Sequence, residues 1–223
     1  MVHQIILTSK YRVFLESLIL SLLILIIGIS IGFYIENYRT DKVVNDYKVF
    51  EINALDLKLQ NYYYQIMNTA SCNFTIESNL KFADEIYDEG LLIAKYEETQ
   101  EFSDNLLLAK KRYVLLKTEL WLNSILLKQK CKNAPHTVVY IYSQTGEMKK
   151  SAEQEAVSNE LKKLKEKYGN EIVLIPIAGD LELDSVDLQM KIYNIQYLPS
   201  VLIDEKVVLE GYHSASEIEE NLN

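Results

Sequence analysis

The longest apolar stretch of the chain lies near its N-terminus. Residues 17–35 form a run of 19 residues without a charged side chain. A helix of that length spans about 28 Å at 1.5 Å per residue, close to the thickness of the hydrocarbon core of a bilayer. A cleaved signal peptide is the alternative, but the run is long and no small-x-small cleavage site follows it. We therefore expect a tail at residues 1–12 and an uncleaved transmembrane helix at residues 13–36.

Four small residues recur along this apolar run. They are Ser17, Ser21, Gly28 and Gly32, and their spacing of 4, 7 and 4 puts them on one helix face. Small residues let two membrane helices approach closely, and Gly28 and Gly32 form a GxxxG pair. This face is a candidate site for pairing with a second copy of the chain. A chance arrangement in an apolar helix is the alternative.

A helical pattern follows the span and continues to the first proline, Pro135. Asn73 is a good N-cap for a second helix, and Thr99 or Ser103 can cap a third. We therefore expect an antiparallel three-helix stalk over residues 37–131. Apolar residues at spacings of 3 and 4 predict a coiled-coil-like seam on the first of these helices: Ile52, Leu55, Leu59, Tyr62 and Ile66.

The two cysteines fall at the ends of this expected stalk. Cys72 ends the first helix and Cys131 ends the third, so both lie at the membrane-distal end of the bundle. They are candidates for one disulfide, which would imply an oxidising, extracytoplasmic location. Two buried and inert thiols are the alternative.

The hydrophobic period changes after Pro135, and the pattern predicts the order βαβαββα for residues 135–223. The first helix of this part ends at Gly169, Asp184 caps a short second one, and Ser214 with Glu217 forms a capping box at the start of the last. A polar turn at residues 204–206 joins the last two strands into a hairpin. The four expected strands cover residues 137–142, 172–177, 200–203 and 207–209.

Residues 135–223 resemble the thioredoxin family in its minimal form. The resemblance lies in the strand at 138–142, the helix that ends in Lys-Tyr-Gly, the strand at 172–177 and the segment 193–200 before the hairpin. Its most specific element is Leu198-Pro199-Ser200. The resemblance implies a cis peptide bond before Pro199 and a loop that holds extended peptides. The whole chain resembles membrane-anchored archaeal and bacterial thioredoxin-like proteins in which a helical stalk precedes the domain.

The chain departs from this family at the redox motif. The family's C-x-x-C follows the first strand, but the region after residue 142 reads Ser-Gln-Thr-Gly-Glu-Met, and no cysteine follows Cys131. Thiol exchange needs a thiolate, so dithiol chemistry within residues 135–223 is excluded. The three histidines, His3, His136 and His213, share no ligand spacing, so we expect no metal and no cofactor.

Charge narrows the choice of partners. The net charge is −9, and residues 132–223 carry nine basic and sixteen acidic side chains. This part would repel a phosphate backbone, so we expect no nucleic acid partner. The leading hypothesis is a redox-inactive, membrane-anchored module that binds or scaffolds a protein or extended peptide, with its soluble part outside the cytoplasm. The alternatives are a thiol–disulfide oxidoreductase that uses Cys72 and Cys131, and a structural homodimeric spacer.

Overall fold

A computed structural model describes residues 11–35, 72–97, 104–144 and 148–222. It also describes Ile52, Leu55, Asp56, Lys58, Leu59, Tyr62 and Tyr63. The chain divides into two compact units, residues 1–51 and residues 52–223.

One apolar helix, Tyr11–Ile35, forms the described part of the first unit. It is 25 residues long and apolar enough to cross a membrane, and all of its residues are exposed. This confirms the expected apolar helix near the N-terminus. The helix includes residues 11 and 12, which were expected in the tail at residues 1–12, whereas residues 1–10 and residue 36 lie outside the described residues. The hydroxyls of Ser17 and Ser21 donate to backbone carbonyls of this helix, at Phe14 and Leu18.

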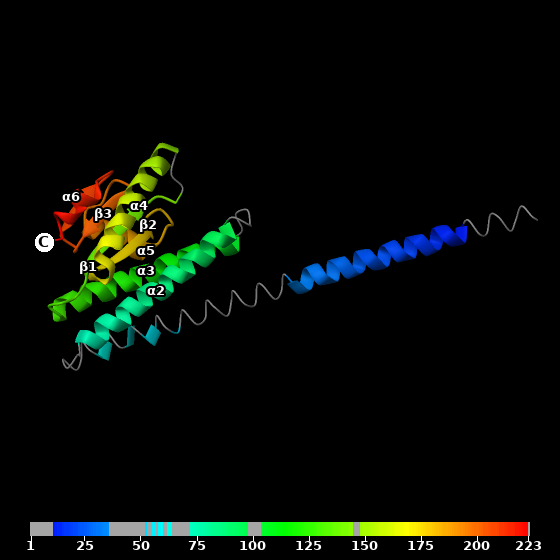
Figure 1. Ribbon diagram of the computed structural model, residues 1–223, viewed down its shortest axis with the longest axis horizontal. Coiled ribbons are helices and arrows are strands. Elements are labelled where there is room, and N and C mark those ends of the chain that lie inside the picture. The colour runs from blue at the N-terminus through cyan, green and yellow to red at the C-terminus, as the bar shows by residue number, and fades with distance from the viewer. Residues whose placement is uncertain are drawn as a thin grey trace, which may run out of the picture. The chain divides into compact units, whose positions relative to one another are not determined.

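An antiparallel helical hairpin is the first continuously described part of the second unit. Helix α2 (Cys72–Glu97) lies along α3 (Asp104–Lys130), as Figure 1 shows. Cys72 opens α2, whereas the sequence placed it at the end of the preceding helix. The rest of the expected stalk, residues 37–71, is described only at the seven positions named above, so the three-helix stalk stays a prediction. The apolar residues buried in the two helices include Phe82, Ile86, Ile93, Leu116, Leu120 and Leu127.

A four-stranded sheet follows the hairpin, and the α/β class is confirmed. The strands lie in the order β2-β1-β3-β4; β1 and β2 are parallel, and the other two pairs are antiparallel. A short 3₁₀ turn, Gly169–Glu171, precedes β2. The elements are β1 (His136–Tyr142), α4 (Met148–Tyr168), β2 (Ile172–Ala178), α5 (Asp184–Ile192), β3 (Ser200–Ile203), β4 (Val207–Glu210) and α6 (Ala215–Glu219).

Helices α4 and α6 cover one face of the sheet. Alternate residues of β1 point to this face, because side chains of a strand alternate between its two sides. Val138 and Tyr140 therefore pack against α4, while Val139 and Ile141 face the other way. Ile218 of α6 is fully buried in the same core. The other members of this core include Val157, Leu161, Leu164, Ile172, Val201, Ile203 and Leu222.

Helices α3 and α5 cover the opposite face. Trp121 of α3 is 1% exposed, and its ring centroid lies 5.6 Å from that of Tyr193, which follows α5. The Trp121 indole N–H donates to Glu205 in the β3–β4 turn at 3.0 Å. Further along α3, the Lys128 ammonium donates to Asp204 and Glu205 at 2.5 and 2.9 Å. The hairpin of helices is therefore fastened to the sheet by α3.

The sequence predicted the N-terminal cap of α6 correctly and that of α5 incorrectly. Ser214 and Glu217 form the capping box expected at the start of α6. Asp184 was expected as a cap, but it is the first residue of α5; the cap position is Leu183, which makes no side-chain cap bond. The prediction was wrong because a favourable N-cap residue type is also favourable in the first turn, near the positive end of the helix dipole.

Candidate functional site

The best candidate site lies where the carboxyl ends of β1 and β2 meet the start of β3. Ile141 pairs with Ile177 on one side and with Ser200 on the other, so the residues after β1, after β2 and before β3 share one edge of the sheet. We call this the carboxyl edge. Ligands of open α/β sheets bind outside the carboxyl ends of the parallel strands. The edge consists of residues 142–144, 179–180 and 198–200.

A hydrogen-bonded network occupies the segment after β1. The Ser143 hydroxyl donates to Asp180 at 2.7 Å, and the Gln144 N–H donates to the second oxygen of the same carboxylate at 2.7 Å. The Gln154 side chain of α4 accepts from the Ser143 N–H and donates to the Ser143 carbonyl, at 2.6 and 3.1 Å. Gln154 and Asp180 therefore bind Ser143 and Gln144 from two sides.

The predicted peptide-binding loop lies at the same edge. The peptide bond between Leu198 and Pro199 is cis. Pro199 and Ser200 are buried, and the Ser200 hydroxyl donates to the Tyr197 carbonyl at 2.5 Å. Leu198 is only half-buried, and Tyr197 is exposed, with its hydroxyl donating to Glu153 at 2.9 Å. Tyr197 and Leu198 are therefore the accessible side chains of residues 197–200.

The residues around Gly179, beneath the loop at residues 197–200, are closely packed. A Cβ at Gly179 would come within 2.9 Å of Ile141 and within 3.2 Å of Leu198 and Met190. Glycine is therefore needed after β2, so that the loop and α5 can approach the sheet. Away from Gly179, Leu188 and Ile192 of α5 remain exposed, one helical turn apart. Both lie on α5, outside the loop at residues 197–200.

An unusual lysine lies on α3, in the part of the helix that approaches the end of β1. Lys117 is 4% exposed, and its ammonium lies 3.9 Å from the centre of the Tyr113 ring. Burial lowers the pKa of Lys117 to about 7. Burial also raises the pKa of Tyr113, with smaller contributions from nearby Tyr142 and Glu89. Tyr113 is therefore held uncharged near neutral pH, and Lys117 loses its charge in the same range.

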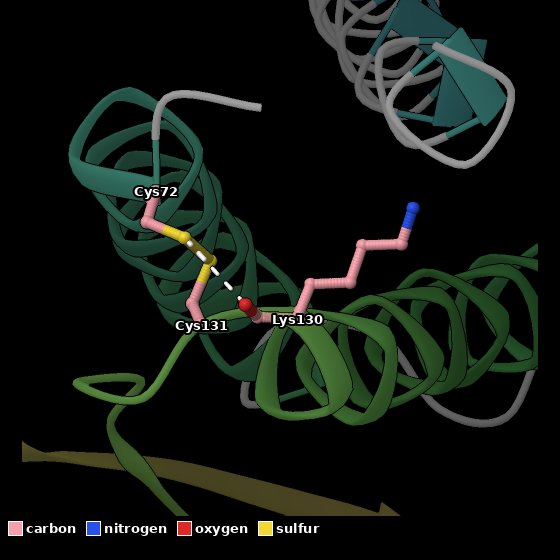
Figure 2. Close-up of a disulfide and its surroundings, with 3 residues drawn as sticks. All are labelled: Cys72, Lys130 and Cys131. Atoms are coloured by element: carbon pink, nitrogen blue, oxygen red, sulfur yellow. Dashed lines mark hydrogen bonds between the residues drawn. A yellow bond between two sulfur atoms is a disulfide. The ribbon is translucent and has the colours of Figure 1, made fainter. Parts of the chain in front are cut away.

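The two cysteines form a disulfide far from the carboxyl edge. Figure 2 shows the bond joining Cys72, at the start of α2, to Cys131, just after α3. The Cys72 sulfur also lies 3.9 Å from the Lys130 carbonyl oxygen. Cys131 leads into the start of β1, while the Pro199 loop lies beside the end of β1. Seven residues of strand separate the two ends, about 20 Å at the usual rise.

The polar groups described at the carboxyl edge are hydroxyl, amide and carboxylate groups that hydrogen-bond to one another. Ser143 faces a carboxylate, whereas a serine nucleophile needs a base such as histidine beside it. The His136 Nδ1 lies 2.6 Å from a carboxylate oxygen of Asp204 in the β3–β4 turn, and the His213 Nε2 lies 3.2 Å from the Glu210 carbonyl oxygen. In the part of the chain that the structure describes, no group of three His, Cys, Asp or Glu residues could hold a metal ion.

Sequence reasoning named the loop and the cysteines, and it missed the polar groups around them. The structure brings Leu198, Pro199 and Ser200 together at the carboxyl edge, and it pairs Cys72 with Cys131 elsewhere. Ser17, Ser21, Gly28 and Gly32 lie in the first unit, and no atom comes within 4 Å of a Cβ built at either glycine. Lys117 was missed as well, because a lysine in a helix is normally exposed and nothing in the sequence signals that this one is buried.

Comparison with known proteins gives only a weak structural likeness. No family model matches the sequence, and no curated protein matches it. Among solved structures, a chloroplastic thioredoxin z is similar, with 18% sequence identity and a TM-score of 0.32. The match covers 40% of this chain and 75% of the other. The crystal structure of that thioredoxin z defines a novel, type-specific target recognition, which is a property of that protein.

Proposed function

We propose that this chain is a membrane-anchored, redox-inactive protein of thioredoxin-like topology that binds an extended segment of a partner protein. In this proposal the apolar helix is a single-span anchor in the cell membrane, and residues 37–131 form a three-helix stalk. Residues 135–223 have the βαβαββα order of the thioredoxin family, and the soluble part lies outside the cytoplasm. The disulfide supports the last point, because such bonds persist in oxidising compartments.

One observation carries the proposal: the cysteine pair and the Pro199 loop lie at opposite ends of β1. A thiol–disulfide oxidoreductase needs a reactive sulfur where its substrate is held. Here the position after β1 carries Ser143, fixed by Asp180, and the sulfurs are joined about 20 Å away. A loop without sulfur can still bind, because an extended peptide is held by main-chain bonds and pockets for alternate side chains.

The experiment measures peptide binding to the full chain in lipid nanodiscs. Random twelve-residue peptides are selected on the wild type, and their affinity is then measured by fluorescence anisotropy. We expect Tyr197→Ala and Leu198→Asp to weaken binding at least tenfold, because these two side chains are the accessible part of the loop. The matched control is Leu188→Ala on α5, which removes an exposed leucine outside the loop. Equal affinities for the loop variants and the control would contradict a site at the loop.

A second assay addresses the enzyme alternative. Reduction of a disulfide substrate is followed with the wild type and with Cys72→Ser/Cys131→Ser. We expect no activity from either protein above the background rate of the reductant. Turnover by the wild type that the double variant loses would contradict redox inactivity and would favour the oxidoreductase alternative.

A further inference from the structure

A second apolar surface, unrelated to the carboxyl edge, lies along the stalk. It combines two stripes that we call the apolar seam. The first stripe recurs at spacings of 3 and 4 in residues 52–62, and the second recurs every seven residues on α3. Each of these side chains keeps between 39% and 66% of its surface exposed. The members of the apolar seam are Ile52, Leu55, Leu59, Tyr62, Leu108, Leu115 and Leu122.

An ion pair shows that the two stripes are neighbours. The Lys58 ammonium lies 3.4 Å from the Glu119 carboxylate of α3. On α3, Leu115 and Leu122 lie four residues before and three residues after Glu119, so they share its face. Lys58 in turn lies three residues after Leu55 and four before Tyr62, on the border of the first stripe. The apolar seam is therefore one surface, built by two segments that are about 60 residues apart.

The size of this surface exceeds what a monomer usually exposes. Seven large side chains at these exposures present on the order of 800 Å² of surface. The largest apolar patch of a typical monomer covers about 300–600 Å². A standard specific interface buries about 800 Å² on each partner. Covering the seam thus fits the needs of a stable protein contact.

We propose that the apolar seam binds the same seam on a second copy of this chain, so that the protein is a homodimer with two-fold symmetry. A partner must offer apolar side chains at spacings of 3 and 4 to interdigitate with the first stripe, and a second copy does so. The proposal rests on the membrane anchor of the proposed function, because copies confined to one membrane meet at a raised effective concentration. It does not depend on the Pro199 loop.

Energy transfer between labelled full-length chains in liposomes tests this dimer. Donor and acceptor are attached at the C-terminus, and the ratio of protein to lipid is varied. We expect a dimer whose dissociation constant rises at least tenfold with Leu55→Glu/Leu59→Glu and with Leu108→Glu, because each change buries a charge in an apolar contact. The matched control, Leu188→Glu/Ile192→Glu on α5, should change the dissociation constant of the dimer less than twofold.

Several outcomes would overturn the proposal. The first is energy transfer no greater than that expected from chains placed at random in the membrane. The second is a set of seam variants with the same dissociation constant as the control. The third is a dimer that Gly28→Ile/Gly32→Ile abolishes but that the seam variants still form. A photo-cross-linking residue at Tyr62 decides the case in which a seam variant fails to fold. A covalent dimer supports the proposal, and cross-links only within one chain overturn it. A monomer that still binds peptides would leave the proposed function intact.

Discussion

At the scale of single residues, Lys117 is the least expected feature of the core. A lysine is seldom buried without an ion-pair partner close by, because removing its charge from water costs several kcal/mol. Its ammonium lies over the Tyr113 ring, and an aromatic face attracts a cation more weakly than a carboxylate does. Burial therefore dominates and lowers the pKa of Lys117 to about 7. The folded protein releases this proton more readily than the unfolded chain does.

This release makes stability depend on pH. The unfolded chain holds the Lys117 proton up to about pH 10.5, the ordinary value, while the folded protein loses it above about pH 7. The unfolded state thus binds more protons in this window, and the free energy of unfolding rises with pH there. We expect Lys117→Met to raise the free energy of unfolding at pH 7 by about 2–4 kcal/mol and to flatten the slope. Urea unfolding at pH 7 and pH 9.5 measures both. The exposed Lys191→Met is the control, and an unchanged slope in Lys117→Met would contradict the burial argument.

Gly90 in α2 has a role in packing, although glycine is unfavourable inside a helix. Alanine stabilises a helix interior by about 1 kcal/mol relative to glycine. A Cβ at position 90 would, however, collide with the hydroxyl of Tyr113 on α3. We expect Gly90→Ala to lower the free energy of unfolding by about 1–3 kcal/mol, because Tyr113 would have to shift away from its place beside the Lys117 ammonium. Adding Tyr113→Phe should recover part of the loss. Urea unfolding compares the single and double variants, and a stabilised Gly90→Ala would contradict the close approach.

At the scale of elements, the disulfide is the main covalent constraint. It joins the start of α2 to the end of α3 across 59 positions of the sequence. Closing a loop of that length removes unfolded-state entropy worth about 4 kcal/mol in the chain-entropy model. We expect Cys72→Ser/Cys131→Ser to lower the free energy of unfolding by about that amount. Denaturation with and without dithiothreitol is the measurement. Dithiothreitol should leave the free energy of unfolding of the double variant unchanged. A wild type whose free energy of unfolding is also unchanged by dithiothreitol would contradict the prediction.

The elements themselves were largely predictable from the sequence, because local patterns determine them. The strands at 136–142 and 172–178 follow from continuous apolar runs, and the capping box at Ser214 follows from two residues at fixed spacing. The expected helix lengths put Cys72 and Cys131 at one end of the stalk and made them candidates for a disulfide, with two inert thiols as the alternative. Lys117 and the network of Ser143 and Asp180 were not predictable, since each depends on contacts between residues distant in sequence. Local patterns carry no information on such contacts.

At the scale of the whole molecule, the packing of α3 on the sheet could not be read from the sequence. Trp121 and Lys128 bind the β3–β4 turn, so the expected boundary between residues 131 and 135 falls inside one compact unit. The reason is physical: α5 has only nine residues and leaves much of one sheet face uncovered. An apolar sheet face must be covered by another layer, and α3 supplies it.

This packing predicts how fragments behave. A fragment of residues 132–223 lacks Trp121 and exposes the face of Val139 and Ile141. We expect it to bind a hydrophobic dye and to unfold without a cooperative transition, because its core has only one complete side. A fragment of residues 72–223 keeps α2, α3 and the disulfide and should unfold cooperatively. Calorimetry and dye fluorescence compare the two, and cooperative unfolding of the shorter fragment would show that residues 135–223 fold alone.

The same sulfur–sulfur bond also determines whether the products of proteolytic cleavage separate. Residues 72–131 form a covalent ring, because the bond joins the start of one helix to the residue after the next. A cut anywhere in the backbone between Glu97 and Asp104 opens that ring without releasing either piece. The nicked molecule would migrate as an intact chain on a gel without reductant and would separate into two bands once reduced. Cleavage at the tip of the hairpin would thus leave the sheet tethered to the apolar N-terminal helix.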